Sequence, residues 1–103
     1  MRDDVKLSHS AALILRTIDC GYSYGFDIMD VTGLPSGTVY PALRRLERDG
    51  LITAKWEDEV TAFAEQRPAR RYYRVTRPGK QSLLRLMEKY PLLEKVTAAR
   101  KTD

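Results

Sequence analysis

The spacing of apolar residues over the first part of the chain predicts helices. Apolar side chains recur three or four residues apart, which places them along one face of a helix. The first helix is expected over about 8–20, with Ser8 or Ser10 as its cap and Gly21 at its end, and the second over about 24–31. The apolar positions of these segments are Leu7, Ala11, Ile14, Leu15 and Ile18, then Phe26, Ile28 and Met29.

A third helix is expected to begin at a Ser36 or Thr38 cap and to stop at Asp49-Gly50. A cap at Thr38 would keep Pro41 within the first turn, where proline is tolerated. One face of this segment is apolar, and the opposite face is polar and basic. The apolar face consists of Val39, Ala42, Leu43 and Leu46, and the polar face of Gly37, Tyr40, Arg44 and Arg48.

Alternating apolar and polar residues then predict two strands, over 51–57 and 70–76. A polar segment from about 58 to 69 separates them, so we expect a β-hairpin with a long loop at its tip. Trp56 shares a strand face with Ile52 and Ala54. This placement favours packing of the indole in the core or at its rim.

Leucines and a methionine at helical spacing predict a last helix over Gln81–Tyr90. Pro91 must break or kink it, or start a fresh helix that runs to about Ala99. The expected order is three helices, two strands and one further helix. This is a mainly helical α+β fold that resembles a winged helix-turn-helix.

The composition argues against a membrane, metal or catalytic protein. The longest apolar run, Ala11–Leu15, is far shorter than the roughly 20 residues of a membrane span. The N-terminus lacks the apolar core of a signal peptide, so we expect a cytoplasmic protein. Cys20 and His9 are too few for a disulfide or a structural zinc site. With no phosphate loop, metal spacing or nucleophile motif, we expect no enzyme and no cofactor.

Basic residues are concentrated in one segment, although the net charge is only +4. Residues 67–80 contain no acid, whereas 56–66 contain four acids and no base. An unpaired cationic strip favours a polyanionic partner, nucleic acid first, although a solvated basic surface is the commoner origin of a charge run alone. We expect the acidic half of the hairpin loop to fold away from DNA and the basic half to face it; the alternative is a disordered loop. The bases are Arg67, Arg70, Arg71, Arg74, Arg77 and Lys80.

The third helix carries side chains that suit the major groove of duplex DNA. Its first N–H groups can hold a phosphate, and Tyr40 can hydrogen-bond another. Arg44 and Arg45 are long enough to reach base edges or phosphates. An equally simple interpretation pairs the helix's arginines with its own acids, Glu47 and Asp49, on a solvated surface.

Three stretches resemble the PadR family of transcriptional regulators. Ser36–Glu47 (SGTVYPALRRLE) is similar to the family's third helix, and Arg67–Thr76 (RPARRYYRVT) to its second wing strand. Tyr24–Ile28 (YGFDI) resembles the start of its second helix, so the match covers about 11–87. The resemblance implies that the third helix reads the major groove and that the wing touches the flanking backbone. The implied DNA contacts are Ser36, Thr38, Tyr40, Arg44, Lys55, Arg67, Arg70 and Arg71.

The resemblance also implies a homodimeric repressor that binds a pseudo-palindromic operator. A DNA-binding domain would cover 1–78 and a helical dimerisation segment 79–103. Small hydrophobic or phenolic effectors release some family members from DNA. The apolar stripe near the C-terminus could line such a pocket, but packing against the first helix and a second subunit is commoner for such a stripe. The stripe consists of Leu83, Leu86, Met87, Tyr90, Leu93 and Val96.

Two other functions stay open at this point. A winged-helix interaction module would dock an acidic protein partner without sequence-specific DNA binding. A docking helix usually presents apolar anchors, whereas this one presents Tyr40, Arg44 and Arg48. Single-stranded RNA binding would need several stacking aromatics on the sheet, and Tyr72 is the one candidate. The polar face of the third helix therefore favours duplex DNA.

Overall fold

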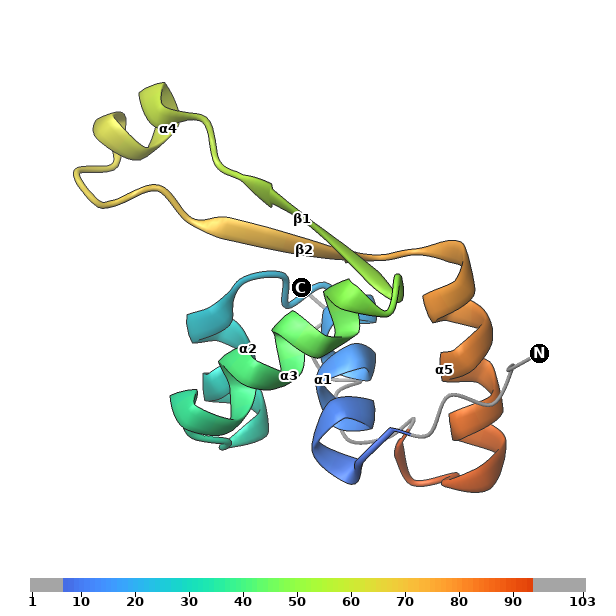
Figure 1. The fold of residues 1–103 in the computed structure, drawn as a ribbon. Helices are drawn as coiled ribbons and strands as arrows, with labels where there is room; N and C mark the ends of the chain where they lie inside the picture. The colour runs from blue at the N-terminus through green and yellow to red at the C-terminus, as the bar shows by residue number, and fades with distance from the viewer. Residues whose placement is uncertain (1–6, 94–103) are drawn as a thin grey trace.

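The elements follow one another in the predicted order, with one addition at the tip of the hairpin. The computed structural model describes residues 7–93, and it consists of a helical body from which the hairpin projects (Figure 1). The mainly helical α+β winged helix-turn-helix is thereby confirmed. The elements are α1 (His9–Asp19), α2 (Gly25–Thr32), α3 (Ser36–Arg48), β1 (Ile52–Trp56), α4 (Glu59–Ala64), β2 (Arg71–Val75) and α5 (Arg77–Lys89).

Helix α1 is the centre of the hydrophobic core. Ser8 caps its start by accepting a hydrogen bond from the Ala11 N–H (3.1 Å), as predicted. Ile14 and Leu15 are fully buried, and α1 contacts α2, α3, α5 and β2. Cys20 is buried directly after the helix, as a small apolar filler. Each fully buried aliphatic side chain contributes about 1.5–3 kcal/mol, so the body depends on the apolar face of α1.

Helix α2 buries only part of the apolar set that the sequence assigns to it. Ile28 is fully buried, but Phe26, another of the three apolar positions of this segment, is 74% exposed. Two residues span about 200° around a helix, which puts Phe26 and Ile28 on opposite faces. Gly33 ends the helix in the left-handed region, with a φ of 74° that suits glycine.

Helix α3 begins before its predicted cap residues. The Thr38 N–H donates to the Pro35 carbonyl (2.9 Å), so Pro35 is the cap and the prediction of a Ser36 or Thr38 cap is wrong. Pro41 consequently lies in the helix interior, where it lacks the N–H that would bond the Gly37 carbonyl. Gly37 is exposed, so water can reach that carbonyl. The buried face is the predicted one, with Val39, Ala42, Leu43 and Leu46.

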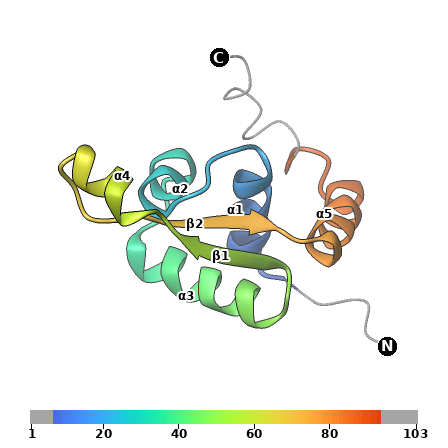
Figure 2. The same ribbon diagram turned by 90° about the horizontal axis from the view of Figure 1, so that it is seen from above.

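Strands β1 and β2 form the predicted antiparallel hairpin, which is the wing of the fold. Their pairing runs from Ile52 opposite Val75 to Trp56 opposite Arg71. Seen from above, α3 lies beside β1, and α5 lies at the other end of the hairpin from α4 (Figure 2). Ile52 is buried, but Trp56 is 61% exposed because its end of the strand extends beyond the body. Of the two expected placements of Trp56, in the core or at its rim, the core is therefore wrong.

The tip of the wing contains the short helix α4, so the segment 58–69 is not the continuous loop that the sequence suggests. Asp58 caps α4 by accepting a hydrogen bond from the Val60 N–H (3.4 Å). Ala62 is buried, whereas Val60 and Phe63 are exposed. Six residues are too few to show a helical period, which explains why the pattern did not predict this helix.

Thr76 joins the start of α5 to the end of α3. Its hydroxyl accepts a hydrogen bond from the Gly79 N–H (3.1 Å) and donates one to the Gly50 carbonyl (2.6 Å). With Thr76 as its cap, α5 begins at Arg77, earlier than the predicted Gln81. One short side chain thus sets the position of two helices.

The C-terminal end of α5 agrees with the predicted break. The helix ends at Lys89, and its C-cap Tyr90 directly precedes Pro91. The predicted continuation to Ala99 and the dimerisation residue Val96 lie outside the described residues. Within 7–93, no helix is long and apolar enough to cross a lipid bilayer.

Gly79 and Gly37 allow a matched test of packing at two helical glycines. A Cβ on Gly79 would collide with the Leu51 carbonyl oxygen and lie 2.9 Å from Val75 Cγ1, whereas a Cβ on Gly37 meets nothing within 4 Å. Gly79→Ala should lower the free energy of unfolding by about 1–3 kcal/mol, although alanine is the better helix former. Gly37→Ala should raise it by about 0.5–1 kcal/mol.

Urea unfolding at one matched protein concentration measures both changes. A Gly79→Ala protein as stable as the parent would contradict the close approach of α5 to Leu51.

Candidate nucleic-acid interface

The outer face of α3 presents the polar and basic side chains that the sequence predicts there. Tyr40, Arg44 and Arg45 are all exposed, on the side opposite the buried apolar residues of the helix. Ser36 is exposed at the start of the helix, and Thr38 is half-buried one turn in. Four of the five α3 residues that are predicted to contact DNA are therefore exposed to solvent.

The start of α2 is held against both α3 and the wing. Gly25 is buried beneath Tyr40, whose hydroxyl occupies the place where a Cβ on Gly25 would lie. The Tyr73 N–H of β2 donates to the Ser23 carbonyl (2.8 Å), just before α2 begins. The N-terminal end of α2, the outer face of α3 and the wing therefore form one braced unit.

A groove of about 610 Å³ lies between α3, the start of α2 and the wing. Figure 1 shows how the wing extends beyond the ends of these two helices on this side of the body. Aromatic rings and arginines share the groove's surface, so it combines apolar area with positive charge. Its lining includes Phe26, Tyr40, Arg44, Glu47, Trp56 and Arg71.

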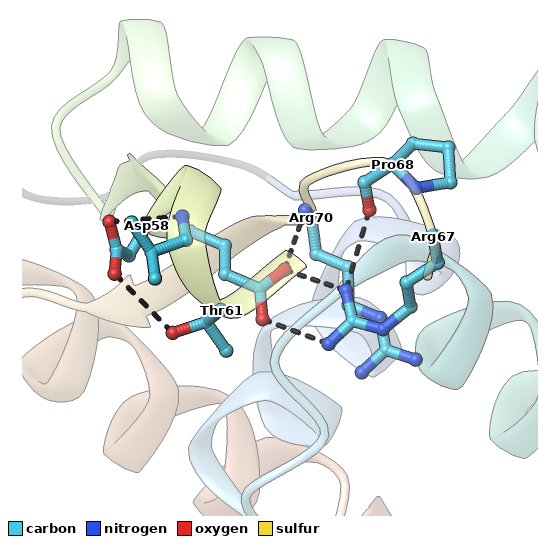
Figure 3. Close-up of polar contacts among 7 residues, drawn as sticks. Asp58, Thr61, Arg67, Pro68 and Arg70 are labelled. Atoms are coloured by element: carbon cyan, nitrogen blue, oxygen red, sulfur yellow. Dashed lines mark hydrogen bonds and ion pairs between the residues drawn. The ribbon is translucent and has the colours of Figure 1, made fainter. Parts of the chain in front are cut away.

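Glu57 and Arg67 form a two-pronged ion pair across the base of the wing tip. Arg67 Nη1 and Nη2 donate to the Glu57 carboxylate at 2.6 and 2.9 Å, and the Arg70 N–H donates to the same carboxylate at 3.1 Å. Figure 3 shows this cluster next to the Asp58–Thr61 contact of α4. The Arg67 hydrogen bonds, with the Arg70 N–H, lower the pKa of Glu57 to about 2, and the same pair raises the pKa of Arg67.

The next two arginines of the wing are also engaged. Arg71 Nη2 lies 3.2 Å from the Glu47 carboxylate on α3, and its guanidinium carbon lies 5.5 Å from the centre of the Trp56 ring. Arg70 lies over the Tyr24 ring at 4.1 Å. These cation–π and ionic contacts connect β2 with α3 and with the residue that precedes α2.

Half of the basic strip is therefore paired with carboxylates, and the prediction of an unpaired strip is wrong for Arg67, Arg71 and Lys80. Lys80 Nζ lies 2.8 Å from the Asp19 carboxylate. Glu57 of the acidic stretch also holds Arg67 of the basic half, so these two charges meet at the base of the wing tip. A hairpin brings its two ends together, so opposite charges at those ends neutralise each other. The expected orientation of the two halves relative to DNA stays a prediction.

Four exposed cations on α3 and the hairpin form no ion pair with a carboxylate of the described residues. Two of them lie on α3, and the wing strands carry one each. They therefore remain available to a phosphate. The four are Arg44, Arg45, Lys55 and Arg74.

Three residues belong to this site although the sequence pattern suggests other roles for them. Phe26 and Trp56 line the groove instead of the core, and Glu47 holds Arg71. A helical wheel centred on Ile28 turns Phe26 outward, so a signal for Phe26 exists in the sequence. Glu47 and Arg71 are 24 residues apart, and no local spacing predicts their contact.

The described residues contain no cluster of three or more His, Cys, Asp or Glu side chains that could hold a metal ion. His9 is exposed and meets the Tyr90 ring edge-on, with 5.1 Å between the ring centres.

Comparison with known proteins identifies relatives of this fold. The model of the transcriptional regulator PadR-like family matches residues 14–85, whereas no curated protein matches the chain. A PadR-like transcription factor from Bacteroides fragilis is 27% identical, with a TM-score of 0.66 over 82% of each chain. A PadR family transcription regulator from hypervirulent Clostridium difficile R20291 is 26% identical, with a TM-score of 0.72 over 86% of this chain and 94% of that one. A protein from Streptococcus mutans UA159 is 26% identical, with a TM-score of 0.68 over 81% and 76%.

The Glu57–Arg67 pair makes the wing sensitive to acid. The pKa of Glu57 is about 2 in the folded protein, against an ordinary value of 4.5. The pair therefore stabilises the folded wing fully above about pH 4.5, and this contribution is lost as the pH falls toward 2. A carbon-13 NMR titration of the Glu57 carboxyl should give a midpoint near 2.

Arg67→Ala should raise this midpoint toward the ordinary value, although the Arg70 N–H still favours the carboxylate. Arg48→Ala is the matched control, because Arg48 pairs with Asp49 away from the wing and its loss should leave the midpoint unchanged. A parent protein that titrates at the ordinary pKa would exclude the pair in solution.

Proposed function

Because the chain belongs to the PadR-like family of transcriptional regulators, we propose that it acts as a homodimeric repressor that binds a pseudo-palindromic operator in duplex DNA. Members of this family are transcription regulators and not enzymes. The observation that carries the proposal is the outer face of α3. This face presents Tyr40, Arg44 and Arg45 beside the groove. Within residues 7–93, neither arginine forms an ion pair with a carboxylate.

In this proposal α3 enters the major groove, which is wide enough for one helix. Arg44 donates two hydrogen bonds to a guanine edge, the commonest specific contact that an arginine makes. Ser36, Thr38 and Tyr40 contact the phosphates that flank this base, and Arg45 reaches the same strand of the backbone. The burial of the opposite face of α3 supports this orientation, since it leaves only the polar face for DNA.

The wing contacts the flanking backbone through its free cation Lys55 and through Arg70, which the Tyr24 ring holds in place. Arg67 and Arg71 keep their carboxylate partners, so each contributes less positive charge toward a phosphate than a free arginine does. Their main role in the proposal is to brace the wing against the body. Base preference then comes from α3, and the wing adds affinity that is common to all duplexes.

Helix α5 and the segment after it form the dimer interface in this proposal. Leu83 is 1% exposed and Leu93 is buried, so these two predicted dimerisation residues already lie in the subunit's own core. Leu84 and Leu92 are 57% and 70% exposed, and exposed apolar residues of this kind mark contact surfaces. The predicted Leu86, Met87 and Tyr90 are half-buried against the core and complete the surface.

A two-fold dimer places its two copies of α3 about one turn of DNA apart, near 34 Å, which is why the operator is expected to be a pseudo-palindrome. Action in the cytoplasm and release from DNA by a small hydrophobic or phenolic effector complete the proposal. The apolar side of α5 packs against α1 of the same subunit, so little of that side is left to line a ligand pocket.

The experiment that tests the proposal selects preferred sites from randomised duplexes and then titrates the best site by fluorescence anisotropy. A scrambled duplex of equal length runs beside it at 50 and 200 mM salt. We expect tight binding to the selected site at the higher salt, saturating at two chains per duplex, and much weaker binding to the scrambled one. Equal, weak binding to both duplexes would instead support a protein-interaction module.

Arg44→Ala separates base reading from general attraction. Loss of a two-pronged guanine contact should cost about 1–3 kcal/mol of binding free energy and relax the base preference at one position of each half-site. Arg85→Ala on α5 removes the same charge outside the proposed DNA contacts of α3 and the wing, so it should leave the base preference of the selected site unchanged. Repeating the site selection with both variants measures this. An unaltered site preference after Arg44→Ala would remove Arg44 from the contact map.

Leu84→Glu tests the proposed dimer surface. A charge placed in an apolar interface loses its hydration without a partner, so the dimer dissociation constant should rise about ten-fold or more. Val60→Glu puts the same charge on another exposed apolar position, on α4, and should leave dimerisation unchanged. Sedimentation velocity over a concentration series compares the two. Equal dissociation constants for the parent and Leu84→Glu would move the interface elsewhere.

A further inference from the structure

The exposed ring of Phe26 has no role in the packing of the body. It is 74% exposed on the second residue of α2, although Ile28 on the same helix is completely buried. We propose that Phe26 is a specificity-determining residue that contacts the 5-methyl group of a thymine in the major groove beside α3. This inference rests on the proposed DNA-binding function and deepens it by assigning one base type to one side chain.

The place of Phe26 in the fold connects it with the proposed reading face. Phe26, Tyr40 and Arg44 line the same groove, so the phenyl ring faces the space next to the side chains that are expected to contact DNA. The thymine methyl is the principal apolar group that B-form DNA displays in the major groove. The exposed ring of Phe26 therefore suits a thymine methyl group, and the neighbouring Arg44 suits the polar edge of an adjacent base.

The support behind Phe26 is rigid, which suits a residue that discriminates between bases. Gly25, its neighbour in the chain, is buried under the Tyr40 hydroxyl, with no room for a Cβ. The carbonyl of Ser23 is tied to β2 by the Tyr73 N–H (2.8 Å). A ring mounted on a braced element loses little conformational freedom when it binds, so more of the contact energy is expressed as affinity.

The other exposed phenylalanine shows what distinguishes Phe26. Phe63 is 84% exposed on α4, at the wing tip, and it does not line the groove. Its helix is flanked by Asp58 and Glu65 and contains Glu59, and DNA phosphates would repel these carboxylates. Phe63 is therefore a matched control, with the same residue type and similar exposure in a different electrostatic setting.

The test combines protein variants with single-atom-group changes in the DNA. Each thymine of the selected operator is replaced in turn by deoxyuridine, which removes the 5-methyl group and keeps the pairing and the polar edges. For the parent protein, one thymine in each half-site should lose about four-fold in affinity, which corresponds to one buried methyl group. Phe26→Ala should bind the unmodified operator about ten-fold more weakly. Replacing that thymine by deoxyuridine should not lower the affinity of this variant any further. Phe63→Ala should behave as the parent in both measurements.

Several outcomes would overturn the proposal. They are parent-like binding by Phe26→Ala, and equal deoxyuridine losses for the parent and Phe26→Ala at every thymine. A shift of the monomer–dimer equilibrium by Phe26→Ala without DNA would show that a second copy of the chain covers the ring instead. Phe26→Leu, which keeps an apolar side chain, should still respond to the methyl group and replaces the alanine variant if that one does not fold. A parent protein without sequence preference would remove the proposed function itself, whereas failure of the Phe26 variants alone leaves that function standing.

Discussion

The arrangement of the whole surface depends on the burial of one face of α1. Ile14 and Leu15 on that helix are inaccessible to solvent, and α2, α3, α5 and β2 all contact it. Each neighbour must turn its own apolar side toward α1, so its polar side faces outward. The outer face of α3 is thus a consequence of core packing, because Leu43 and Leu46 have no other place to be buried.

The spacing of apolar residues predicted the helices and strands that this packing requires. It was less informative about where these elements end and about the side chains that line the groove. The alternation around Ile52 and Tyr73 and the helical spacing of Val39 to Leu46 report burial directly, so the wing and the buried face of α3 follow from the sequence. The cap of α3 does not, because Pro35 takes that position through its carbonyl alone and has no capping side chain. The list of apolar positions in the second helix does not separate Phe26 from Ile28, although two residues span about 200° around a helix and only Ile28 is buried.

The ion pairs of the site show a second limit of sequence patterns. Glu57 and Arg67 are ten residues apart, and Glu47 and Arg71 are 24 apart, so each pair exists only because the hairpin folds back. A count of charges along the chain treats these arginines as a free basic strip. In the folded protein, some cations form ion pairs that brace the wing. Others, such as Arg44, form no ion pair with a carboxylate within residues 7–93.

The paired arginines have a consequence for how such a regulator would find its site. Non-specific attraction to DNA grows with the number of counterions that free cations displace from the phosphates. By holding Arg67 and Arg71 on carboxylates, Glu57 and Glu47 lower that number, whereas Arg44 and Arg45 of α3 form no such ion pair in the described part of the chain. The protein would then leave random genomic DNA sooner and spend a larger share of its time free to search. The ratio of specific to non-specific affinity stays the same, because the charge of the wing acts on all duplexes alike.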